Sequence, residues 1–314
     1  MKWFLGIDGG ATKTEACITN ENAEKIALAY SGPSNYQTVG IKKAIRNIEK
    51  ATIQACTAVN IEPPVDYACI ALAGINSPLD YETMISELAK LDLFAKLRVI
   101  HDGEAALYAA TRGNKGIIVI LGTGSLVAAY DNKGNYIRAC NWGHLLGDEG
   151  SAYRIVIKTF SRILKGYDGR LSKIKTQDEI FERLKIKNPS DLASIVYTKM
   201  NNEDIAKLAP FIIQKAMEDE EILKILKNEA EQVAECVKVI HEKTGWNEVY
   251  LTGGLTKNLF YVNLVEEEIK KKLNNIKIKI LEVKPILGTI LLMFDEEKIK
   301  EDYAKKVYEI LSKF

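Results

Sequence analysis

The sequence predicts an α/β protein made of two β-β-β-α-β-α units, the second of which carries a helical insertion. Three short strand-like segments open the chain, and a similar trio returns after residue 115. Residues 151–244 instead mix charged and apolar side chains in the manner of helices. The length of 314 residues agrees with this division, because it is long for one core and comfortable for two domains.

The first predicted unit contains five strands and three helices. The strands are expected at residues 3–7, from residue 12 onward, and at residues 25–30, 65–72 and 97–101. The helices are expected at residues 40–59, 79–90 and 105–111. In the first of these helices, Ile41, Ala44, Ile45 and Ile48 recur at three- and four-residue spacing, which predicts an amphipathic helix.

The second unit repeats the opening pattern of strands. They are expected at residues 116–121, 126–130, 136–139, 248–252 and 277–283. Residues 255–272 are compatible with a helix, and further helical pieces end the chain. We therefore expect an N-terminal lobe of residues 1–113 and a C-terminal lobe of residues 114–314, with the C-terminal helix able to pack back on the first lobe.

Composition and charge narrow the class of protein. Hydrophobic residues make up 47% of the chain and charged residues 27%, which is ordinary for a soluble globular protein. The formal net charge of +1 argues against binding to nucleic acid or to a membrane surface, because such proteins carry a basic excess. No apolar run approaches the ~20 residues that span a bilayer. The first strand begins near Met1 and leaves no room for a signal peptide, so we expect a cytoplasmic protein.

The cysteines and histidines are scattered. No C-x-x-C pair occurs among Cys17, Cys56, Cys69, Cys140 and Cys236. Neither structural zinc nor a disulfide framework is therefore expected, and each cysteine is interpreted as a small buried apolar residue. The histidines are too dispersed to predict a metal site, and they are His101, His144 and His241.

The most informative motif follows the first strand, where Asp8, Gly9, Gly10, Thr12 and Lys13 lie close together. The two glycines can turn sharply and leave backbone N–H groups uncovered, so this hairpin is suited to holding a polyphosphate. Asp8 could hold a metal ion or a metal-bound water. An ordinary Asp-Gly hairpin turn would explain the same residues if nothing else in the chain supported the phosphate interpretation.

Two further strands end in glycine motifs of the same kind. Gly122, Thr123 and Gly124 follow one of them, and Gly253 and Gly254 follow the other. A single glycine turn is a weak signal, but three at strand ends favour two halves that hold one phosphorylated ligand.

These motifs, taken in order, resemble the N-acetylglucosamine kinase branch of the actin–hexokinase superfamily, which is grouped with the BadF/BadG/BcrA/BcrD-type ATPases. The similarity runs from residue 5 to about residue 290, and residues 141–153 (NWGHLLGDEGSAY) are its most specific part. The resemblance implies a two-lobed actin/hexokinase-like (ribonuclease H-like) fold. It also implies ATP and Mg²⁺ as cofactors, an amino sugar as substrate, and a homodimer.

The resemblance further implies roles for individual residues. Asp102 would be the catalytic base, although an Asp ahead of a helix is also a favoured N-cap. Asp8 would act on the metal through water. Lys13 could equally be a solvated surface residue. The expected ATP-binding residues are Gly9, Gly10, Thr12, Lys13, Gly122, Thr123, Gly124, Gly253, Gly254 and Asn258.

The expected sugar-binding residues are Asn35, Thr123, Trp142, Gly143 and Asp148. Asn35 and Asp148 would hold ring hydroxyls, because short polar side chains supply paired donors and acceptors. Trp142 could equally be a core aromatic, and His144 fits a structural residue that orients a neighbouring loop. Residues 72–75 (LAGI) depart from the Ser-Gly-Gly loop of many relatives, which leaves the N-acetyl or lactyl side of the pocket open.

Three functions are compatible with these residues. The leading one is ATP-dependent phosphorylation of N-acetylglucosamine or N-acetylmuramic acid at the 6-hydroxyl, in amino-sugar or cell-wall sugar salvage, with glucosamine as a third substrate. The second is an ATPase that activates a partner redox enzyme through an iron–sulfur cluster, for which Cys140 is the only loop cysteine near the motifs. The third is a sugar sensor without catalysis, against which Asp102 argues.

Overall fold

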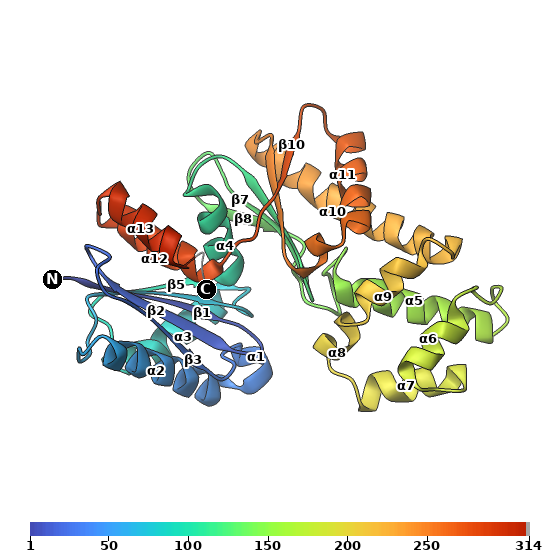
Figure 1. Ribbon diagram of the computed structural model, residues 1–314, viewed down its shortest axis with the longest axis horizontal. Coiled ribbons are helices and arrows are strands. Elements are labelled where there is room, and N and C mark those ends of the chain that lie inside the picture. Colours follow the sequence, from blue (N-terminus) through green and yellow to red (C-terminus); the bar gives the residue numbers. More distant parts are fainter. Residues whose placement is uncertain (312–314) are drawn as a thin grey trace. The chain divides into compact units, whose positions relative to one another are not determined.

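The computed structural model describes residues 1–311, and the chain divides into two compact units (Figure 1). The first unit comprises Met1–Asn114 together with the chain from Val283 onward, and the second comprises Lys115–Glu282. Each unit has its own mixed five-stranded sheet with helices, so the predicted α/β class and the duplicated architecture are confirmed.

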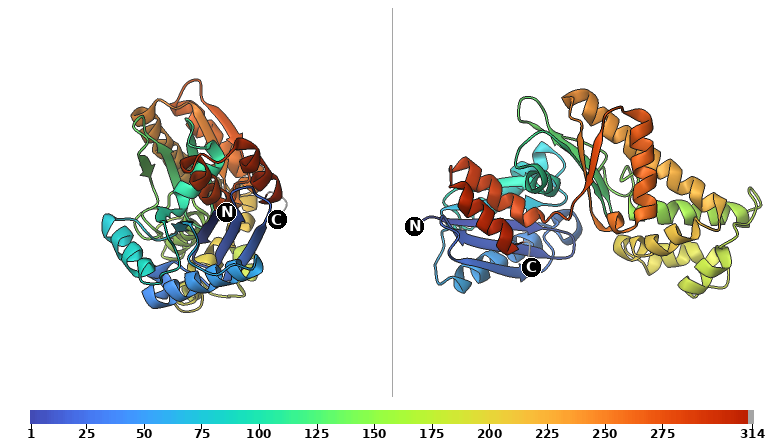
Figure 2. Two further views of the ribbon diagram at one scale, coloured as in Figure 1. Left: turned by 90° about the vertical axis from the view of Figure 1, so that its left-hand side faces the viewer. Right: turned by 45° about the horizontal axis from the view of Figure 1, so that its top comes forward.

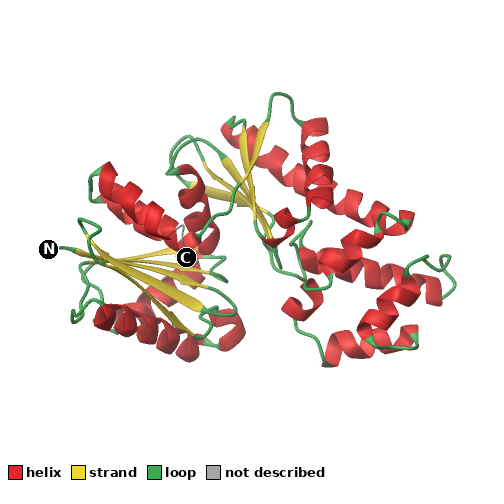
Figure 3. Ribbon diagram, viewed as in Figure 1, coloured by secondary structure: helices red, strands yellow, loops and turns green. Residues whose placement is uncertain are grey.

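The sheet of the first unit has the strand order β3-β2-β1-β4-β5. Figure 3 draws its strands in yellow, with red helices beside them. The strands β1 to β3 are antiparallel neighbours, whereas β4 and β5 run parallel to β1. The strands are β1 (Trp3–Gly9), β2 (Thr14–Asn20), β3 (Ile26–Ser31), β4 (Tyr67–Leu72) and β5 (Leu97–His101). The helices are α1 (Tyr36–Val39), α2 (Ile41–Ala58), α3 (Pro78–Ala89), α4 (Asp102–Thr111), α12 (Pro285–Glu296) and α13 (Glu301–Leu311).

The side chains of β1 point alternately to the two faces of the sheet, and each face contributes to a different apolar layer of the first unit. Leu5 and Ile7 join the cluster that contains Ile48 of α2 and Met84 of α3. Phe4, on the opposite face, joins the cluster built from α12 and α13. Because successive side chains of a strand point to opposite faces, one sheet supports helices on both sides and keeps its strand ends fixed.

The second unit repeats this topology with the strand order β10-β9-β6-β7-β8. Its strands are β6 (Ile117–Leu121), β7 (Ser125–Tyr130), β8 (Tyr136–Ala139), β9 (Glu248–Thr252) and β10 (Lys277–Ile280). The insertion between β8 and β9 contains α5 (Ala152–Tyr167), α6 (Gln177–Leu184), α7 (Pro189–Thr198), α8 (Asn202–Ala206), α9 (Ala209–Lys215) and α10 (Glu220–Thr244). The 3₁₀ helix η1 (Gly254–Lys257) and α11 (Leu259–Lys272) follow β9.

The helix predicted over residues 255–272 is divided at Asn258. Its side-chain carbonyl accepts the backbone N–H of Tyr261 at 3.1 Å, which starts α11 as a new helix after η1. An Asn N-cap satisfies one of the first-turn N–H groups that have no partner inside the helix. Asn258 therefore fixes where α11 begins, immediately after the glycine pair that ends β9.

The two C-terminal helices belong to the first unit (Figure 2), which agrees with the expectation that the C-terminal helix can pack back on it; the second unit ends at Glu282, before the expected end of the C-terminal lobe. Residues 286–294 of α12 are buried without exception, and an apolar helix of this kind needs cover on every side. Gly288 allows the close crossing with α4, because a Cβ at this position would lie 1.8 Å from the carbonyl oxygen of Ala105. The α12 helix thereby fixes α4, which begins with Asp102.

A disulfide joins Cys140, just after β8, to Cys236 of α10, across a sequence separation of 96 residues. The expectation that no cysteine is paired is therefore wrong for these two. Wide separation in sequence concealed a contact that the packing of α10 on β8 creates. Cys17, Cys56 and Cys69 are free and buried, as expected.

Reduction of this disulfide should lower the thermal midpoint of the protein. In the chain-entropy description, a cross-link closing a loop of this size contributes up to about 5 kcal/mol to the free energy of unfolding. We expect dithiothreitol to lower Tm for the wild type and to have no effect on Cys236→Ser. The Cys56→Ser variant is the matched control and should keep the response to reductant. A wild-type Tm that is the same with and without dithiothreitol would contradict the cross-link.

Candidate active site

The first unit brings two carboxylates to one edge of its sheet. Asp8 lies near the end of β1, and Asp102 follows β5 as the first residue of α4. Because β1, β4 and β5 are parallel, their carboxyl ends meet at the same edge. The two groups are close enough for the charge of Asp102 to raise the pKa of Asp8.

Asp8 is held in an environment that disfavours its charge. Burial is the main cause and, together with the negative charges of Asp102 and Glu15, raises the pKa of Asp8 to about 7. Glu15 is the cross-strand partner of Asp8 on β2, and the charge of Lys13 opposes the shift. A divalent cation held through water would relieve this repulsion. Among the described residues, no group of three or more His, Cys, Asp or Glu side chains could hold a metal ion directly.

Asp102 is a helix residue and not the N-cap that was the alternative interpretation. His101 caps α4, because its Nδ1 accepts the backbone N–H of Gly103 at 3.0 Å. Asp102 Oδ1 accepts the same N–H at 2.7 Å and lies 2.9 Å from His101 Nδ1. The side chain of Asp102 is 38% exposed, whereas that of His101 is 2% exposed. The helix expected from residue 105 thus starts earlier because a histidine ring supplies the cap.

The first glycine hairpin is joined to the loop that contains Asn35. The carbonyl of Gly10 accepts the backbone N–H groups of Ser34 and Asn35 at 3.0 and 3.1 Å. A Cβ on Gly9 would lie 2.4 Å from Ser34 Oγ, so only glycine allows this approach. These contacts bring Asn35 to the same strand edge as Asp8.

The side chain of Asn35 also has a structural task. Its Oδ1 accepts the N–H of Gln37 at 3.1 Å and caps α1. Gly74, with φ of +85°, gives Asn35 room, since a Cβ there would lie 2.4 Å from Asn35 Oδ1. Lys13 Nζ lies 2.8 Å from Glu15 Oε2, so in this structure the lysine is paired on the surface of the hairpin.

In the second unit, the hairpin of Gly122, Thr123 and Gly124 is hydrogen-bonded to the start of α5. The N–H of Ala152 donates to Gly122 O at 2.9 Å, and that of Tyr153 donates to Thr123 O at 3.3 Å. The Ser125 hydroxyl donates to Glu149 O at 2.7 Å. The hairpin and the segment leading into α5 therefore form one hydrogen-bonded structure.

Asp148 lies directly beside this hairpin. A Cβ on Gly124 would approach Asp148 Oδ2 to 2.9 Å, so glycine at this position leaves the carboxylate its place. Asp148 is buried, and among the described residues its Oδ1 has no hydrogen-bond partner. Burial raises the pKa of Asp148, while the backbone N–H groups of Ser125 and Gly143 act in the opposite direction. A buried oxygen without a partner is costly unless a ligand supplies a donor.

Trp142 and Gly143 lie in the loop between β8 and α5. Trp142 is 62% exposed, which excludes the alternative of a core aromatic within its unit. The guanidinium carbon of Arg138 lies 4.8 Å from the centre of its ring. Gly143, with φ of +82°, accepts the N–H of Gly147 at 2.8 Å and closes a turn beneath Trp142.

His144 has the surroundings of a structural residue, as the sequence indicates. Its Nδ1 lies 3.0 Å from Asn202 Nδ2, which ties the loop to the start of α8. Its ring packs edge-to-face against Tyr153, with 5.2 Å between ring centres. Ser151 caps α5, because its hydroxyl oxygen accepts the backbone N–H of Arg154 at 3.2 Å.

Gly253 and Gly254 end β9 next to the strand that leads into the second hairpin. Gly253 has φ of +103°, and a Cβ there would lie 2.5 Å from Leu121 O. Only glycine permits this close approach of backbones. Gly254 has open space around its Cα, and η1 and the cap of α11 follow directly.

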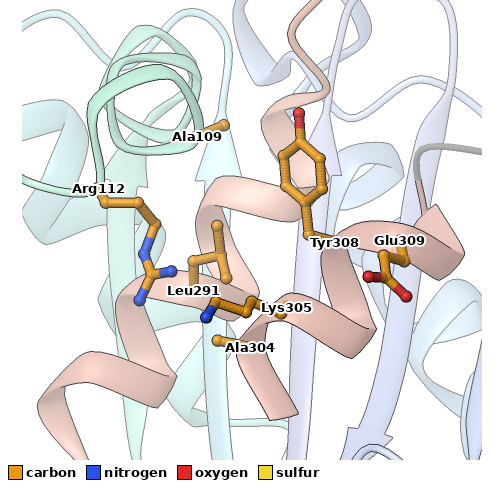
Figure 4. A pocket seen from close by; sticks show the side chains of 7 residues that line it. All are labelled: Ala109, Arg112, Leu291, Ala304, Lys305, Tyr308 and Glu309. Carbon is orange, nitrogen blue, oxygen red and sulfur yellow. The ribbon is translucent and has the colours of Figure 1, made fainter. Parts of the chain in front are cut away.

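A separate pocket of about 230 Å³ lies in the first unit at the far end of α4 from Asp102 (Figure 4). It is lined by Ala109, Arg112, Leu291, Ala304, Lys305, Tyr308 and Glu309. Arg112 already pairs with Asp295 at 2.6 Å and with Glu301 at 3.2 Å. None of the residues that the sequence analysis assigned to ATP, metal or sugar lines this pocket.

Two buried residues near the site were not foreseen from the sequence. Glu229 of α10 accepts the N–H of Gly150 at 2.8 Å, and Tyr261 of α11 donates its hydroxyl to Gly150 O at 2.9 Å. Both are far from the loop in sequence, and neither follows a strand or belongs to a glycine motif. A buried glutamate on an otherwise apolar helix face was the available signal.

Each unit thus places a glycine hairpin beside a carboxylate at one edge of a β-β-β-α-β-α sheet, which is the arrangement of the actin/hexokinase-like class. The chain belongs to the BadF/BadG/BcrA/BcrD ATPase family, which matches residues 5–292.

Relatives and solved structures agree with this class. The chain is 30% identical to the N-acetylmuramic acid/N-acetylglucosamine kinase of Clostridium acetobutylicum, over 90% of this chain and 95% of that one. It is 28% identical to the N-acetyl-D-glucosamine kinase of Dictyostelium discoideum, over 94% and 98% of the two chains. A solved structure of a proposed N-acetylglucosamine kinase from Chromobacterium violaceum superimposes with a TM-score of 0.77 at 21% identity, covering 93% and 99%.

Proposed function

We propose that this protein transfers the γ-phosphoryl group of ATP to the 6-hydroxyl of an N-acetylated amino sugar, either N-acetylglucosamine or N-acetylmuramic acid. Family membership and the two relatives with amino-sugar kinase names support this proposal. The observation that carries it is the buried carboxylate of Asp148, which lies beside the second glycine hairpin with one oxygen lacking a partner among the described residues.

Asp102 is the proposed general base. Its half-exposed carboxylate at the sheet edge would accept the proton of the attacking sugar hydroxyl. Asp8 would hold Mg²⁺ through water, and the bound ion would neutralise charge on the ATP phosphates. The backbone of Gly9 and Gly10, with Thr12 and Lys13, would bind phosphate oxygens. To bind a phosphate oxygen, Lys13 must leave its ion pair with Glu15, so it exchanges a carboxylate for a phosphate at the surface of the hairpin.

The second unit would bind the rest of both substrates. Gly122, Thr123 and Gly124 form the proposed second phosphate hairpin, and Gly253, Gly254 and Asn258 the proposed adenosine motif. Asp148 and Thr123 of this unit would take sugar hydroxyls, as would Asn35 of the first unit, and Trp142 with Gly143 would line the sugar. A largely exposed indole ring suits contact with the C–H face of a pyranose.

Replacing Asp148 by Asn should raise the KM for the sugar by roughly 10- to 100-fold, because a hydrogen bond to a charged group contributes about 1.5–3 kcal/mol. The KM for ATP should change less than about threefold. Glu149→Gln, in the adjacent position, is the matched control and should leave both constants near their wild-type values. Equal effects of the two substitutions on the sugar KM would contradict the assignment.

The direct test of the proposed activity is ADP release from Mg-ATP with and without sugar. N-acetylglucosamine, N-acetylmuramic acid, glucosamine and glucose form an informative panel. We expect strong stimulation by one or both N-acetylated sugars and a low rate without sugar, because such kinases exclude water until the sugar is bound. ADP release that is independent of every sugar would contradict the kinase.

We further propose a cytoplasmic homodimer that acts in amino-sugar or peptidoglycan recycling, with the catalytic base in the first unit. Among the helices that the structure describes, none combines the length and apolar character needed to cross a membrane. In a reducing compartment the Cys140–Cys236 pair would be a dithiol.

The alternative of an ATPase that activates a redox enzyme has weaker support. A cluster shared between subunits needs cysteines on accessible loops. Cys140 is bonded to Cys236, and the other three cysteines are buried in the first unit. An iron determination on purified protein separates the two functions, and stoichiometric iron together with sugar-independent ATP hydrolysis would favour the activator.

A further inference from the structure

The loop between β8 and α5 depends on contacts from outside itself. It carries the proposed sugar-binding residues, yet it forms neither helix nor strand from Cys140 to Ser151. Left-handed backbone occurs repeatedly along it, at Cys140, Asn141, Gly143, Asp148 and Gly150. Non-glycine residues in this region are strained and persist only when the surroundings hold them.

Gly150 is where the second half of this loop is held. Its N–H donates to Glu229 Oε2 at 2.8 Å, and its carbonyl accepts the Tyr261 hydroxyl at 2.9 Å. Both hydrogen bonds are buried. A Cβ at Gly150 would lie 2.1 Å from Val233 Cγ2, so the glycine backbone lies directly on α10. Side chains from α10 and α11 thus bind the backbone N–H and the carbonyl of Gly150.

Glu229 and Tyr261, the two side chains that bond to Gly150, are both buried. Glu229 is 1% exposed and Tyr261 is fully buried. The nearest cation to Glu229 is Arg154, with Nε 3.9 Å from Oε2, so the carboxylate is not fully neutralised by a close ion pair. Burial and the charge of Glu229 raise the pKa of Tyr261, which keeps its hydroxyl protonated and able to donate.

Gly150 is connected to Asp148 over a very short distance along the chain. The N–H of Ser151 donates to Asp148 O at 3.1 Å, and the Ser125 hydroxyl fixes the carbonyl of Glu149 between them. A shift of Gly150 would therefore move the carboxylate of Asp148. The hairpin of Gly122 and Gly124 is hydrogen-bonded to the start of α5, but it is also held by the β6–β7 ladder.

We propose that Glu229 and Tyr261 are positioning residues for the sugar, which act by fixing Gly150 and through it the carboxylate of Asp148. This inference rests on the proposed kinase function and deepens it. Neither residue touches a reacting atom. Their effect should therefore be larger on sugar recognition than on ATP recognition, because the hairpin proposed for ATP has the β6–β7 ladder as a second support.

The test compares kinetic constants for three variants with those of the wild type. Tyr261→Phe removes one hydrogen bond while keeping the ring, and Glu229→Leu removes the other at similar volume. Each should raise the sugar KM about five- to tenfold and change the ATP KM less than about twofold, as expected for one buried hydrogen bond. Glu229→Gln keeps an acceptor for the Gly150 N–H and should restore a sugar KM near the wild-type value.

A matched control separates positioning from loss of stability. Tyr250→Phe removes a hydroxyl that donates to Glu248 at 2.6 Å in the same unit but away from the loop. It should lower Tm slightly and leave the sugar KM unchanged. Suppose that the wild type is active. If Tyr261→Phe and Glu229→Leu then keep the wild-type sugar KM, or raise the sugar KM and the ATP KM equally, the inference is wrong while the proposed function stands. A wild type that phosphorylates no sugar would overturn the proposed function, and this inference with it.

Discussion

Asp102→Asn should fold normally and lose roughly 10²- to 10⁴-fold in turnover, the usual contribution of a positioned general base. Asn keeps the shape of the side chain and an oxygen that can accept the Gly103 N–H, so α4 should keep its first turn. What it loses is the ability to take a proton from the sugar hydroxyl. The expected signature is a lower kcat with sugar and ATP KM values near those of the wild type.

The control for this variant is Asp302→Asn, a change of the same kind on the exposed face of α13. It should leave kcat and Tm unaltered. If Asp102→Asn keeps more than about a tenth of the wild-type turnover, Asp102 is not the base. If the variant instead melts well below the wild type, the role of Asp102 is to stabilise α4.

Asp8→Asn should stabilise the metal-free protein while it lowers activity. The folded-state pKa of Asp8 is about 7, against 3.8 for the ordinary carboxyl group. Between these values the unfolded chain has lost this proton and the folded chain has kept it, so wild-type stability falls as pH rises through that window. After allowance for the partial exposure of Asp8, the cost at pH 7.5 is on the order of 1–3 kcal/mol.

The Asn variant removes this cost, because it has no charge to bury. Thermal melting in EDTA at pH 7.5 should give a Tm several degrees higher for Asp8→Asn than for the wild type, and the difference should shrink as pH falls towards 4. The same variant should need more Mg²⁺ for half-maximal turnover. If the Tm of Asp8→Asn is lower than that of the wild type at pH 7.5, or if the difference in Tm does not depend on pH, the folded protein does not disfavour the charged form of Asp8.

The sequence predicted the strands and the hairpins well because their signals are local. Apolar runs such as residues 116–121 and 248–252 lie within a residue of β6 and β9. The sequence also indicated both carboxylates, because Asp8 and Asp102 each follow an apolar strand. That these two residues and Asn35 lie at one edge of the sheet is shown only by the strand pairing and by the bonds from Ser34 and Asn35 to Gly10.

What the sequence did not predict depends on contacts between distant segments. The return of α12 to the first unit requires the close crossing at Gly288, which no local pattern shows. The cysteine pair and the anchors of Gly150 join the β8–α5 region to α10 and α11, far along the chain. The cap of α4 was missed because a histidine ring, and not an Asp side chain, supplies it.

Identification of the product tests the central claim most directly. The protein is incubated with Mg-ATP and N-acetylglucosamine or N-acetylmuramic acid, and the products are examined by phosphorus and proton NMR. The account predicts one sugar phosphate for each mole of ADP, with the phosphorus coupled to the two protons on C6. ADP without a sugar phosphate, or a phosphate on any other hydroxyl, would contradict it.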